Sequence, residues 1–340
     1  MTFEEVIKNN CENISPVEWW PRYAFHYTDV TNAVNIMKEG VLYSRYSVSS
    51  MDLMRNDNAS RQVIDMTCSG AVSNVRFYFR PLTPTQYHNE GFKHSNLRYS
   101  NDTNANVPVP IFFMFDLESI LQMPETRFSE KSLAGYGDDL QCGEEAFSKL
   151  NFHQIYKNGA MSDPELEKKY RHAEIVYPDA FEIPQALKYI VCRNDIEKTT
   201  LLNLLRKEGT KLFSQYKDKV LIWGECFENN GLFIADCRYF EDKSILVFSN
   251  TYNKKRYTSK YKVNDKKMEM KASVEFDWEK SGNLLKRQNC QFSIDYEKTE
   301  TVNFHGLLKP REAKVLYMRV FFESKLVCYM GWQLSDYAML

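Results

Sequence analysis

The chain has 340 residues, 43% of them hydrophobic and 14% aromatic, which is enough for two ordinary cores because domains typically run to ~100–200 residues. Its 44 basic and 45 acidic residues nearly cancel, which excludes a polycation that coats nucleic acid through overall charge. Eight scattered cysteines without a C-x-x-C pair favour a reducing cytoplasm, and the lack of any apolar run near ~18 residues argues against a membrane partner.

The first predicted element is an amphipathic helix over residues 28–40. Its apolar positions recur three and four residues apart, as in one buried helix stripe: Val30, Ala33, Val34 and Met37. Either Thr28 or Asp29 can cap its start, because both side chains can accept a hydrogen bond from a free amide. Gly40 suits the left-handed position after the helix end.

Three short runs rich in aromatic and β-branched residues are predicted strands: residues 75–79, 111–115 and 173–177. Residues 116–121 follow the second run and are predicted to form a short helix. Side chains alternate between the two faces of a strand, so Glu174 points away from the face that its two neighbours occupy. Glu174 is therefore expected on a rigid element.

The character of the chain changes after residue 194. A leucine-rich helix near Leu201 leads into runs of strand type: residues 220–227, 232–238, 245–249, 268–278, 290–296, 315–322 and 326–332. The run 268–278 alternates strictly between apolar and polar residues, as half-buried antiparallel strands do. We therefore predict an enzyme-like domain over residues 1–195 and a β-rich accessory domain for substrate or partner binding over residues 196–340.

Three segments occur in a fixed order: FHYTDVTNAVNIMKEGVLYSR from Phe25, VRFYFRPLTPTQY from Val75 and YRHAEIVYPDAFEI from Tyr170. Over residues 23–193 their order and spacing resemble the DarT family, toxins that use NAD to attach ADP-ribose to bases of single-stranded DNA. The resemblance implies an α+β fold, with a split, twisted ADP-ribosyltransferase-like sheet flanked by helices. The C-terminal β part is then a second, mostly antiparallel domain added to the family's core.

Glu174 is the candidate catalytic carboxylate. Cleavage of the nicotinamide glycosidic bond passes through an oxocarbenium-like sugar, which one nearby carboxylate can stabilise. The resemblance implies that Glu174 bonds the ribose hydroxyl and helps to deprotonate the acceptor base; the alternative is a strand glutamate paired with a surface lysine. It also implies a catalytic arginine that contacts the phosphates, with Arg61 the better match and Arg55 the reserve. A plain surface arginine is the alternative for each.

The resemblance assigns NAD-binding roles to further residues. His26 and Thr28 would hold the adenosine and ribose side of NAD, with the free amides at the start of the following helix; a satisfied core histidine is the alternative. Ser44 and Arg45 match a segment that lines the nicotinamide pocket, although Arg45 could equally be a solvated strand end. Tyr78 can wall a pocket, whereas core packing is the usual role of such an aromatic run.

Two features could contact nucleic acid. Tyr136 lies in a Gly-rich loop where the family places an element that orients the acceptor base, but a surface loop would look the same. A basic run with interleaved tyrosines is suited to phosphates and stacked bases, and a charged hairpin is the alternative; its candidate contacts are Lys254, Lys255, Arg256, Tyr257 and Lys260. The histidines and cysteines show no zinc spacing, so no metal site is predicted.

The chain contains neither a P-loop nor a Rossmann fingerprint, so NAD is expected as a co-substrate and not as a permanent cofactor. We predict transfer of ADP-ribose from NAD to a base of single-stranded nucleic acid, with DNA the family default and messenger RNA possible because of the extra domain. Such a toxin implies an antitoxin partner, and phage defence is a plausible setting. The rivals are an enzyme that modifies protein side chains and a catalytically inactive binding module.

Overall fold

The computed structural model describes residues 1–14, 16–51, 72–97, 106–133, 140–240, 268–296 and 301–334, and the backbone of residues 243–248. A seven-stranded sheet of order β5-β6-β3-β1-β4-β8-β9 organises the N-terminal part. Its strands are β1 (Tyr23–Asp29), β3 (Asn74–Tyr78), β4 (Pro110–Asp116), β5 (Arg127–Ser129), β6 (Glu174–Pro178), β8 (Leu187–Cys192) and β9 (Val220–Ile222). All neighbours are antiparallel except β8 and β9, which run parallel.

The large sheet splits between β1 and β3. Strand β1 pairs with β4 along its whole length, from Tyr23 opposite Asp116 to Asp29 opposite Pro110. In contrast, β1 meets β3 at a single position, where Phe25 lies opposite Tyr78. The two strands therefore separate beyond that point, as the predicted split sheet requires.

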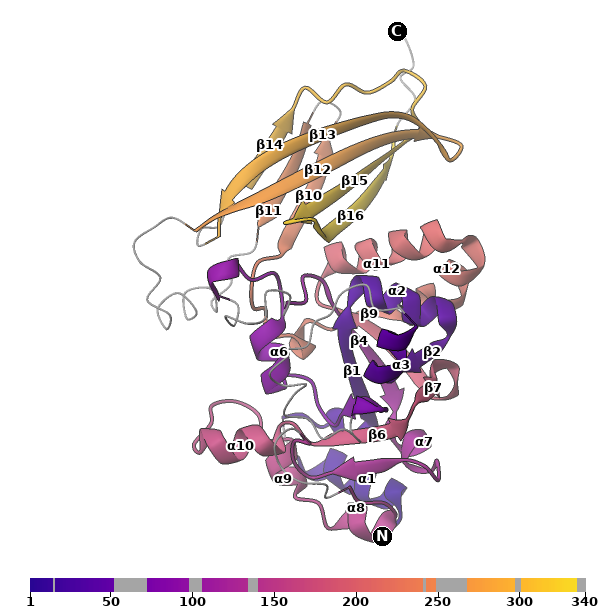
Figure 1. Cartoon of the computed structure of the whole chain (residues 1–340), viewed down its shortest axis with the longest axis vertical. Coiled ribbons are helices and arrows are strands. Elements are labelled where there is room, and N and C mark those ends of the chain that lie inside the picture. The colour runs from indigo at the N-terminus through magenta and orange to yellow at the C-terminus, as the bar shows by residue number, and fades with distance from the viewer. Residues whose placement is uncertain are drawn as a thin grey trace.

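Helices flank this sheet (Figure 1). They are α1 (Phe3–Asn13), α2 (Val30–Glu39), α3 (Arg45–Ser50), α6 (Pro84–Asn89), α7 (Leu117–Leu121), α8 (Glu144–Ser148), α9 (Phe152–Ile155), α10 (Pro164–Tyr170), α11 (Asp195–Glu208) and α12 (Thr210–Tyr216). A small ladder joins β2 (Val41–Tyr43) to β7 (Ala180–Glu182). Of the two caps considered for α2, the structure uses Asp29, which accepts from the amide of Thr31, and Gly40 ends the helix at φ 69°. No helix in the described part of the chain is long and apolar enough to cross a membrane.

The C-terminal strands form two antiparallel sheets, of order β10-β11-β14 and β13-β12-β15-β16. Their bounds are β10 (Ile234–Phe240), β11 (Lys243–Phe248), β12 (Glu269–Lys280), β13 (Asn283–Asp295), β14 (Thr301–His305), β15 (Val315–Phe322) and β16 (Lys325–Gln333). The ring of Phe304 on β14 lies 5.7 Å from that of Phe276 on β12, so the sheets pack face to face. We call this unit the β module; it occupies one end of the long axis in Figure 1.

The α+β prediction is confirmed: a large mixed sheet with flanking helices and a separate antiparallel β unit. The run 220–227 divides differently from the expectation, because β9 pairs with β8 in the large sheet and a 3-10 turn, Gly224–Cys226, follows it. Strand β14, which the sequence pattern did not reveal, pairs with β11. The division between residues 195 and 196 stays a prediction.

Helix α11 covers the β16 edge of the β module at Tyr329. The side-chain amide of Asn203 donates to the carbonyl of Tyr329 on β16 at 2.9 Å, and the Tyr329 amide donates to the Thr200 hydroxyl at 2.9 Å. Side chains of the helix thus take the place of a further strand. A second contact lies at Phe92, whose ring packs 5.4 Å from that of Phe322.

A buried ionic cluster joins the end of α6 to the start of α11 and to the segment before β10. The guanidinium of Arg193 bonds Glu197 and lies 3.3 Å from the Glu90 carboxylate. Glu90 also accepts from the Gln86 amide at 2.7 Å, and from the backbone amide of Asn230 at 3.1 Å. Because Glu90 is fully buried and its oxygens are bonded on several sides, the segment before β10 is held firmly against α6.

Candidate functional site

Glu174 is the first residue of β6 and lies opposite Tyr78 on β3 and Ser129 on β5. Its side chain is 1% exposed, and Arg76 of β3 grips both carboxylate oxygens, with Nε to Oε2 and Nη2 to Oε1 each 2.5 Å. Burial opposes the guanidinium charge, but the Glu174 carboxylate outweighs it and raises the pKa of Arg76. Glu174 is therefore a buried, bidentate ion-pair partner and not a surface glutamate paired with lysine.

His26 lies on β1 at the split in the sheet. Its Nδ1 is 3.0 Å from the backbone oxygen of Arg76, which can only accept, so Nδ1 carries the donated proton and Nε2 is left as an acceptor. Burial lowers the pKa of His26, which favours this neutral ring. Arg76 thus holds both candidates: His26 through its backbone and Glu174 through its side chain.

The sequence placed His26 at a strand end, next to free helix amides, and the structure differs on this point. Strand β1 continues to Asp29, and the Asp29 carboxylate accepts from the Thr31 amide at 3.0 Å and the Thr31 hydroxyl at 2.7 Å. An acidic side chain therefore already occupies the start of α2. Thr28 is buried at the end of β1. The roles of His26 and Thr28 in NAD binding stay predictions, and they now depend on the two side chains and not on helix amides.

Tyr78 lies beside Glu174, and burial, followed by the nearby Glu174 carboxylate, raises the pKa of the phenol. Its hydroxyl is hydrogen-bonded to Thr85 of α6. The Thr85 hydroxyl lies 3.0 Å from Nε2 of His172. Burial and the charge of Arg76 lower the pKa of His172 to about 4, so this ring is neutral near pH 7.

Sequence reasoning missed Arg76, Thr85 and His172. Strand alternation could have revealed Arg76, because it is two residues before Tyr78 and shares a face with it, next to the Glu174 strand. His172 is likewise two residues before Glu174. Thr85 carried no local signal, because it reaches the site only through the packing of α6.

Ser44 and Arg45 begin α3. The Ser44 hydroxyl accepts from the Ser47 amide at 3.2 Å as a helix cap, and the Ser44 amide donates to the carbonyl of Asp179 at 2.7 Å. Asp179 directly follows β6, so this bond ties α3 to the strand that carries Glu174. Arg45 is the first residue of the helix and is half-buried. Their roles in the nicotinamide pocket stay predictions.

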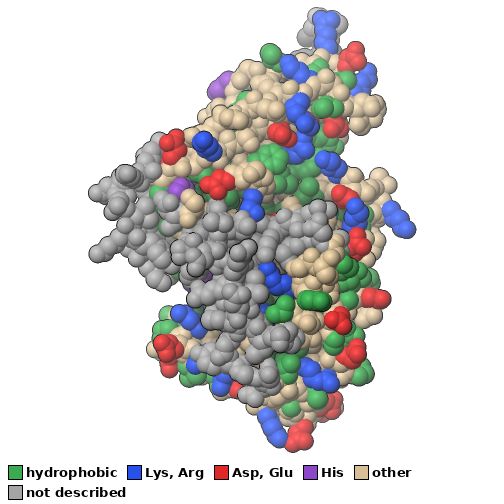
Figure 2. Space-filling view, viewed as in Figure 1, with side chains coloured by type: hydrophobic (Ala, Val, Ile, Leu, Met, Phe, Trp, Pro, Cys, Tyr) green, Lys and Arg blue, Asp and Glu red, His purple; other side chains and the backbone are tan. Residues whose placement is uncertain are grey.

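The remaining predicted site residues lie outside the described part of the chain: Arg55, Arg61, Tyr136, Lys254, Lys255, Arg256, Tyr257 and Lys260. Their roles therefore stay predictions. Where the chain is described, basic and acidic side chains are interspersed on the face shown in Figure 2. No group of histidine, cysteine, aspartate and glutamate side chains that could hold a metal occurs in the ranges that the structure describes.

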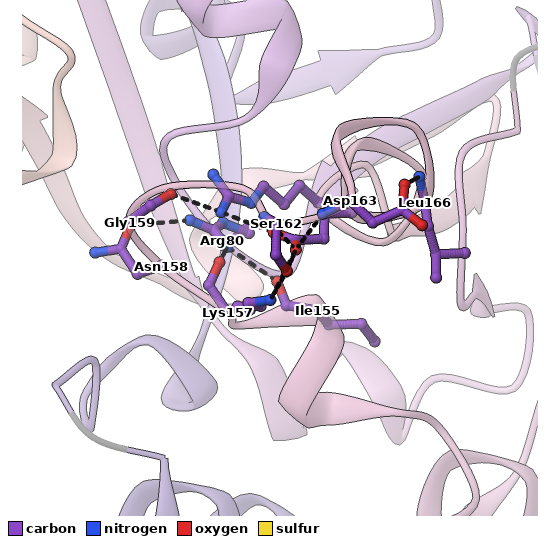
Figure 3. A network of polar contacts seen from close by, with 10 residues as sticks. Arg80, Ile155, Lys157, Asn158, Gly159, Ser162, Asp163 and Leu166 are labelled. Carbon is purple, nitrogen blue, oxygen red and sulfur yellow. Dashed lines mark hydrogen bonds and ion pairs between the residues drawn. The ribbon is translucent and has the colours of Figure 1, made fainter.

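A polar network fastens the loop between α9 and α10, shortly before the Glu174 strand (Figure 3). Arg80 donates to the carbonyl of Lys157 at 2.6 Å, and Arg171 donates to that of Gly159 at 2.8 Å. The Glu167 carboxylate accepts from Lys157 Nζ at 2.7 Å. Burial and the neighbouring Arg171 lower the pKa of Arg80 to about 9. This network positions the chain that leads into Glu174, because the carbonyls of Lys157 and Gly159 are bonded to guanidinium groups.

Comparison with known families assigns this architecture to a class. The model of the DarT family, described as ssDNA thymidine ADP-ribosyltransferase, matches residues 25–221, more than half of the chain. The protein is an NAD-dependent ADP-ribosyltransferase. It belongs to the DarT family, which confirms the resemblance found in the three segments. The match extends beyond residue 193 over α11 and α12 and ends at residue 221, within β9.

Solved structures of family members show limited similarity to the chain. Thermus sp. 2.9 DarT in complex with ADP-ribosylated ssDNA is 14% identical, with 61% of this chain and 96% of that chain covered and a TM-score of 0.49. Its complex with NAD+ is 15% identical, with coverages of 61% and 98% and a TM-score of 0.46. Thermosipho africanus DarTG in complex with ADP-ribose is 11% identical, with coverages of 61% and 51% and a TM-score of 0.44. The comparison with curated proteins gives no match.

Proposed function

We propose that the chain transfers ADP-ribose from NAD to a base of single-stranded nucleic acid, with DNA as the first acceptor to test. Membership of the DarT family supports this reaction. The observation that carries it is Glu174, a buried carboxylate gripped by Arg76 at the split where His26 bonds the same residue. Burial disfavours a charged carboxylate, and the Arg76 guanidinium offsets that cost. A negative charge held at this position is suited to stabilise a positively charged transition state.

The proposed reaction breaks the bond between the nicotinamide nitrogen and C1 of its ribose, and the electron pair leaves with nicotinamide. Glu174 stabilises the positive charge that develops on the sugar and accepts a hydrogen bond from a ribose hydroxyl. Nε2 of His26 is an acceptor for a second hydroxyl of NAD. A base nitrogen then bonds to C1, and the proton that it loses passes to Glu174 or to solvent.

The β module makes RNA a second candidate acceptor. It packs on α11 and on the segment that contains Phe92, so it adds surface next to the enzyme part of the chain. Unpaired bases suit such chemistry in either nucleic acid, because a stacked and paired base hides its reactive atoms. The family description makes thymidine of single-stranded DNA the first base to examine.

We further propose that the enzyme is a toxin with an antitoxin partner, in the cytoplasm and in the setting of phage defence. The described cysteines are all free, which fits a reducing compartment. One structural relative is Thermosipho africanus DarTG in complex with ADP-ribose. Growth of cells that express the wild type or Glu174→Gln tests for toxicity, and restored growth on co-expression of a hydrolase that removes ADP-ribose tests for an antitoxin of that kind.

Radiolabelled NAD incubated with the full chain and separate pools of single-stranded DNA, duplex DNA, RNA and total protein tests the acceptor. We expect label in single-stranded DNA, and little in the duplex. Label in RNA alone would reassign the acceptor, and label in protein alone would favour the protein-directed rival. If the wild type releases no nicotinamide and Glu174→Gln loses no biological function, the chain would instead be a catalytically inactive binding module.

A further inference from the structure

The two side chains of the Arg76–Glu174 ion pair differ in their exposure to solvent. The carboxylate side chain is 1% exposed, whereas the Arg76 side chain is 27% exposed. The two residues lie on neighbouring strands but not directly opposite, since Arg76 pairs with Val176 and Glu174 with Tyr78. The guanidinium therefore reaches diagonally along the sheet to place its two donors on the two carboxylate oxygens.

A buried carboxylate without a cation takes up a proton instead of staying charged. Described residues on the strands beside Glu174 are Arg76 and Tyr78 on β3 and Ser129 on β5. His172 precedes β6 and is influenced by Arg76. Tyr78 and Ser129 are uncharged near neutrality. His172 is neutral too, because burial and Arg76 lower its pKa to about 4. Within this described neighbourhood, Arg76 supplies the positive charge.

We infer that Arg76 is a positioning residue for the transfer reaction, which keeps Glu174 ionised and fixes the direction of both carboxylate oxygens. The inference rests on the proposed function of Glu174. A carboxylate has about four acceptor positions, and the guanidinium fork uses two of them. The remaining positions can accept a ribose hydroxyl while Arg76 stays bound.

The same geometry could serve only to join β3 to β6. The β module offers a matched pair of that kind, in which Arg287 of β13 grips both oxygens of Asp277 of β12 at 2.6 and 2.8 Å. Both pairs connect adjacent antiparallel strands through a bidentate fork. If Arg76 also keeps Glu174 ionised, its loss changes how the rate of nicotinamide release depends on pH. Loss of a purely structural arginine such as Arg287 does not.

The test measures nicotinamide release by the full chain from pH 5 to 9.5, with NAD and a thymine-containing single-stranded oligonucleotide, for wild type, R76Q, R76K and R287Q. In R76Q we expect the acidic limb of the kcat profile to move at least one pH unit upward, because the isolated carboxylate holds its proton to higher pH. Where the moved limb lies above pH 7, kcat at pH 7 falls about tenfold for each pH unit of that distance, since below its pKa the ionised fraction of a carboxyl changes tenfold for each pH unit. It recovers toward the wild-type value at high pH, and KM for NAD changes little.

R76K keeps the positive charge but loses the bidentate guanidinium. The acidic limb of its kcat profile is therefore expected between the limbs of wild type and R76Q. R287Q is expected to match the wild type. Loss of Arg76 also relieves His172 of a neighbouring charge, and the double variant R76Q/H172Q separates the two groups. Its limb is expected to stay with that of R76Q, because Glu174 and not His172 carries the titration.

A kcat that is depressed equally at every pH in R76Q, or an unmoved limb, would overturn the inference and leave a structural pair. If R76Q does not fold, an R76K limb identical to that of the wild type has the same meaning. Nicotinamide release without label in nucleic acid would reject the proposed acceptor while the pH comparison still decides on Arg76. A wild type that releases no nicotinamide under any condition would overturn both.

Discussion

Two arginine–carboxylate clusters in this molecule contain the same chemical groups but differ in solvent exposure and in hydrogen bonding. Arg76 and Glu174 form a pair at the split of the sheet, with the arginine side chain 27% exposed. Arg193, Glu90 and Glu197 form a cluster in which all three side chains are 2% exposed or less. The Glu90 carboxylate is further bonded by side-chain and backbone donors from both sides of the contact with the segment before β10.

The two clusters differ in how the central carboxylate is bonded. Glu90 already accepts from Gln86 and from the backbone amides of Glu228 and Asn230, so it can stabilise a contact but has little left for a ligand. The Glu174 carboxylate accepts from one arginine and has acceptor positions to spare. Glu90 therefore fits a structural role, whereas Glu174, beside an arginine that is 27% exposed, is a candidate for chemistry.

The largest expected loss of stability is that of Arg193→Leu. It leaves Glu90 and Glu197 buried without their cation, and such a change costs about 3–5 kcal/mol of unfolding free energy. Urea unfolding followed by fluorescence measures it. A loss below about 1 kcal/mol would show that the cluster does not hold the segment before β10 in place.

Glu174→Gln is expected to reduce activity more than stability, in contrast to Arg193→Leu. Nicotinamide release and ADP-ribose transfer fall about 100- to 1,000-fold, because the charge that stabilises the transition state is gone. The thermal midpoint is expected to fall less than in Arg193→Leu, because the amide oxygen still accepts one of the two Arg76 bonds and the Arg76 side chain is 27% exposed. A variant that keeps its rate while losing stability would place Glu174 with the structural clusters.

Gly91→Ala tests the close approach beside the Arg193 cluster. Gly91 has φ 72°, and a Cβ there would lie 2.1 Å from the carbonyl oxygen of Asn230. We expect a loss of about 2–4 kcal/mol in urea unfolding from strain and overpacking together. Gly282→Ala is the matched control: Gly282 has φ 80° but nothing within 4 Å, so only strain remains, about 1 kcal/mol. Equal losses in the two variants would contradict the predicted clash.

Arg287→Gln is the smallest expected effect. The Arg287 side chain is 43% exposed, and Asp277 keeps a second partner in Arg319 at 2.6 Å. The loss in unfolding free energy should stay below about 1 kcal/mol, with no change in nicotinamide release. A larger loss would show that even a half-exposed fork is structurally important in this sheet.

Local patterns predicted much of the fold. The spacing of Val30, Ala33, Val34 and Met37 predicted α2, whose buried face consists of these residues. Alternation predicted β12, and the strand that carries Glu174 was placed within one residue of its start. These elements follow from interactions between neighbours in the chain, which the sequence displays directly.

Contacts between distant segments could not be predicted in this way. Glu90 and Arg193 are 103 residues apart, and Arg76 and Glu174 are 98 apart. Their pairing depends on strand order and on how α6 packs, neither of which leaves a periodic signal. The start of α2 illustrates the same limit, because Asp29 and Thr28 both fit the cap and only the length of β1 decides between them.

Asn203 donates a hydrogen bond to Tyr329 and Thr200 accepts one from it, so α11 and the β module cover each other's polar groups at this contact. A β module expressed alone would present β16 as a bare edge, on which a strand of another molecule could add and begin aggregation. A chain cut after β9 would keep α11 but leave these polar groups facing water beside newly uncovered apolar side chains. Shortened versions should therefore be less soluble than the full chain, whichever half is kept.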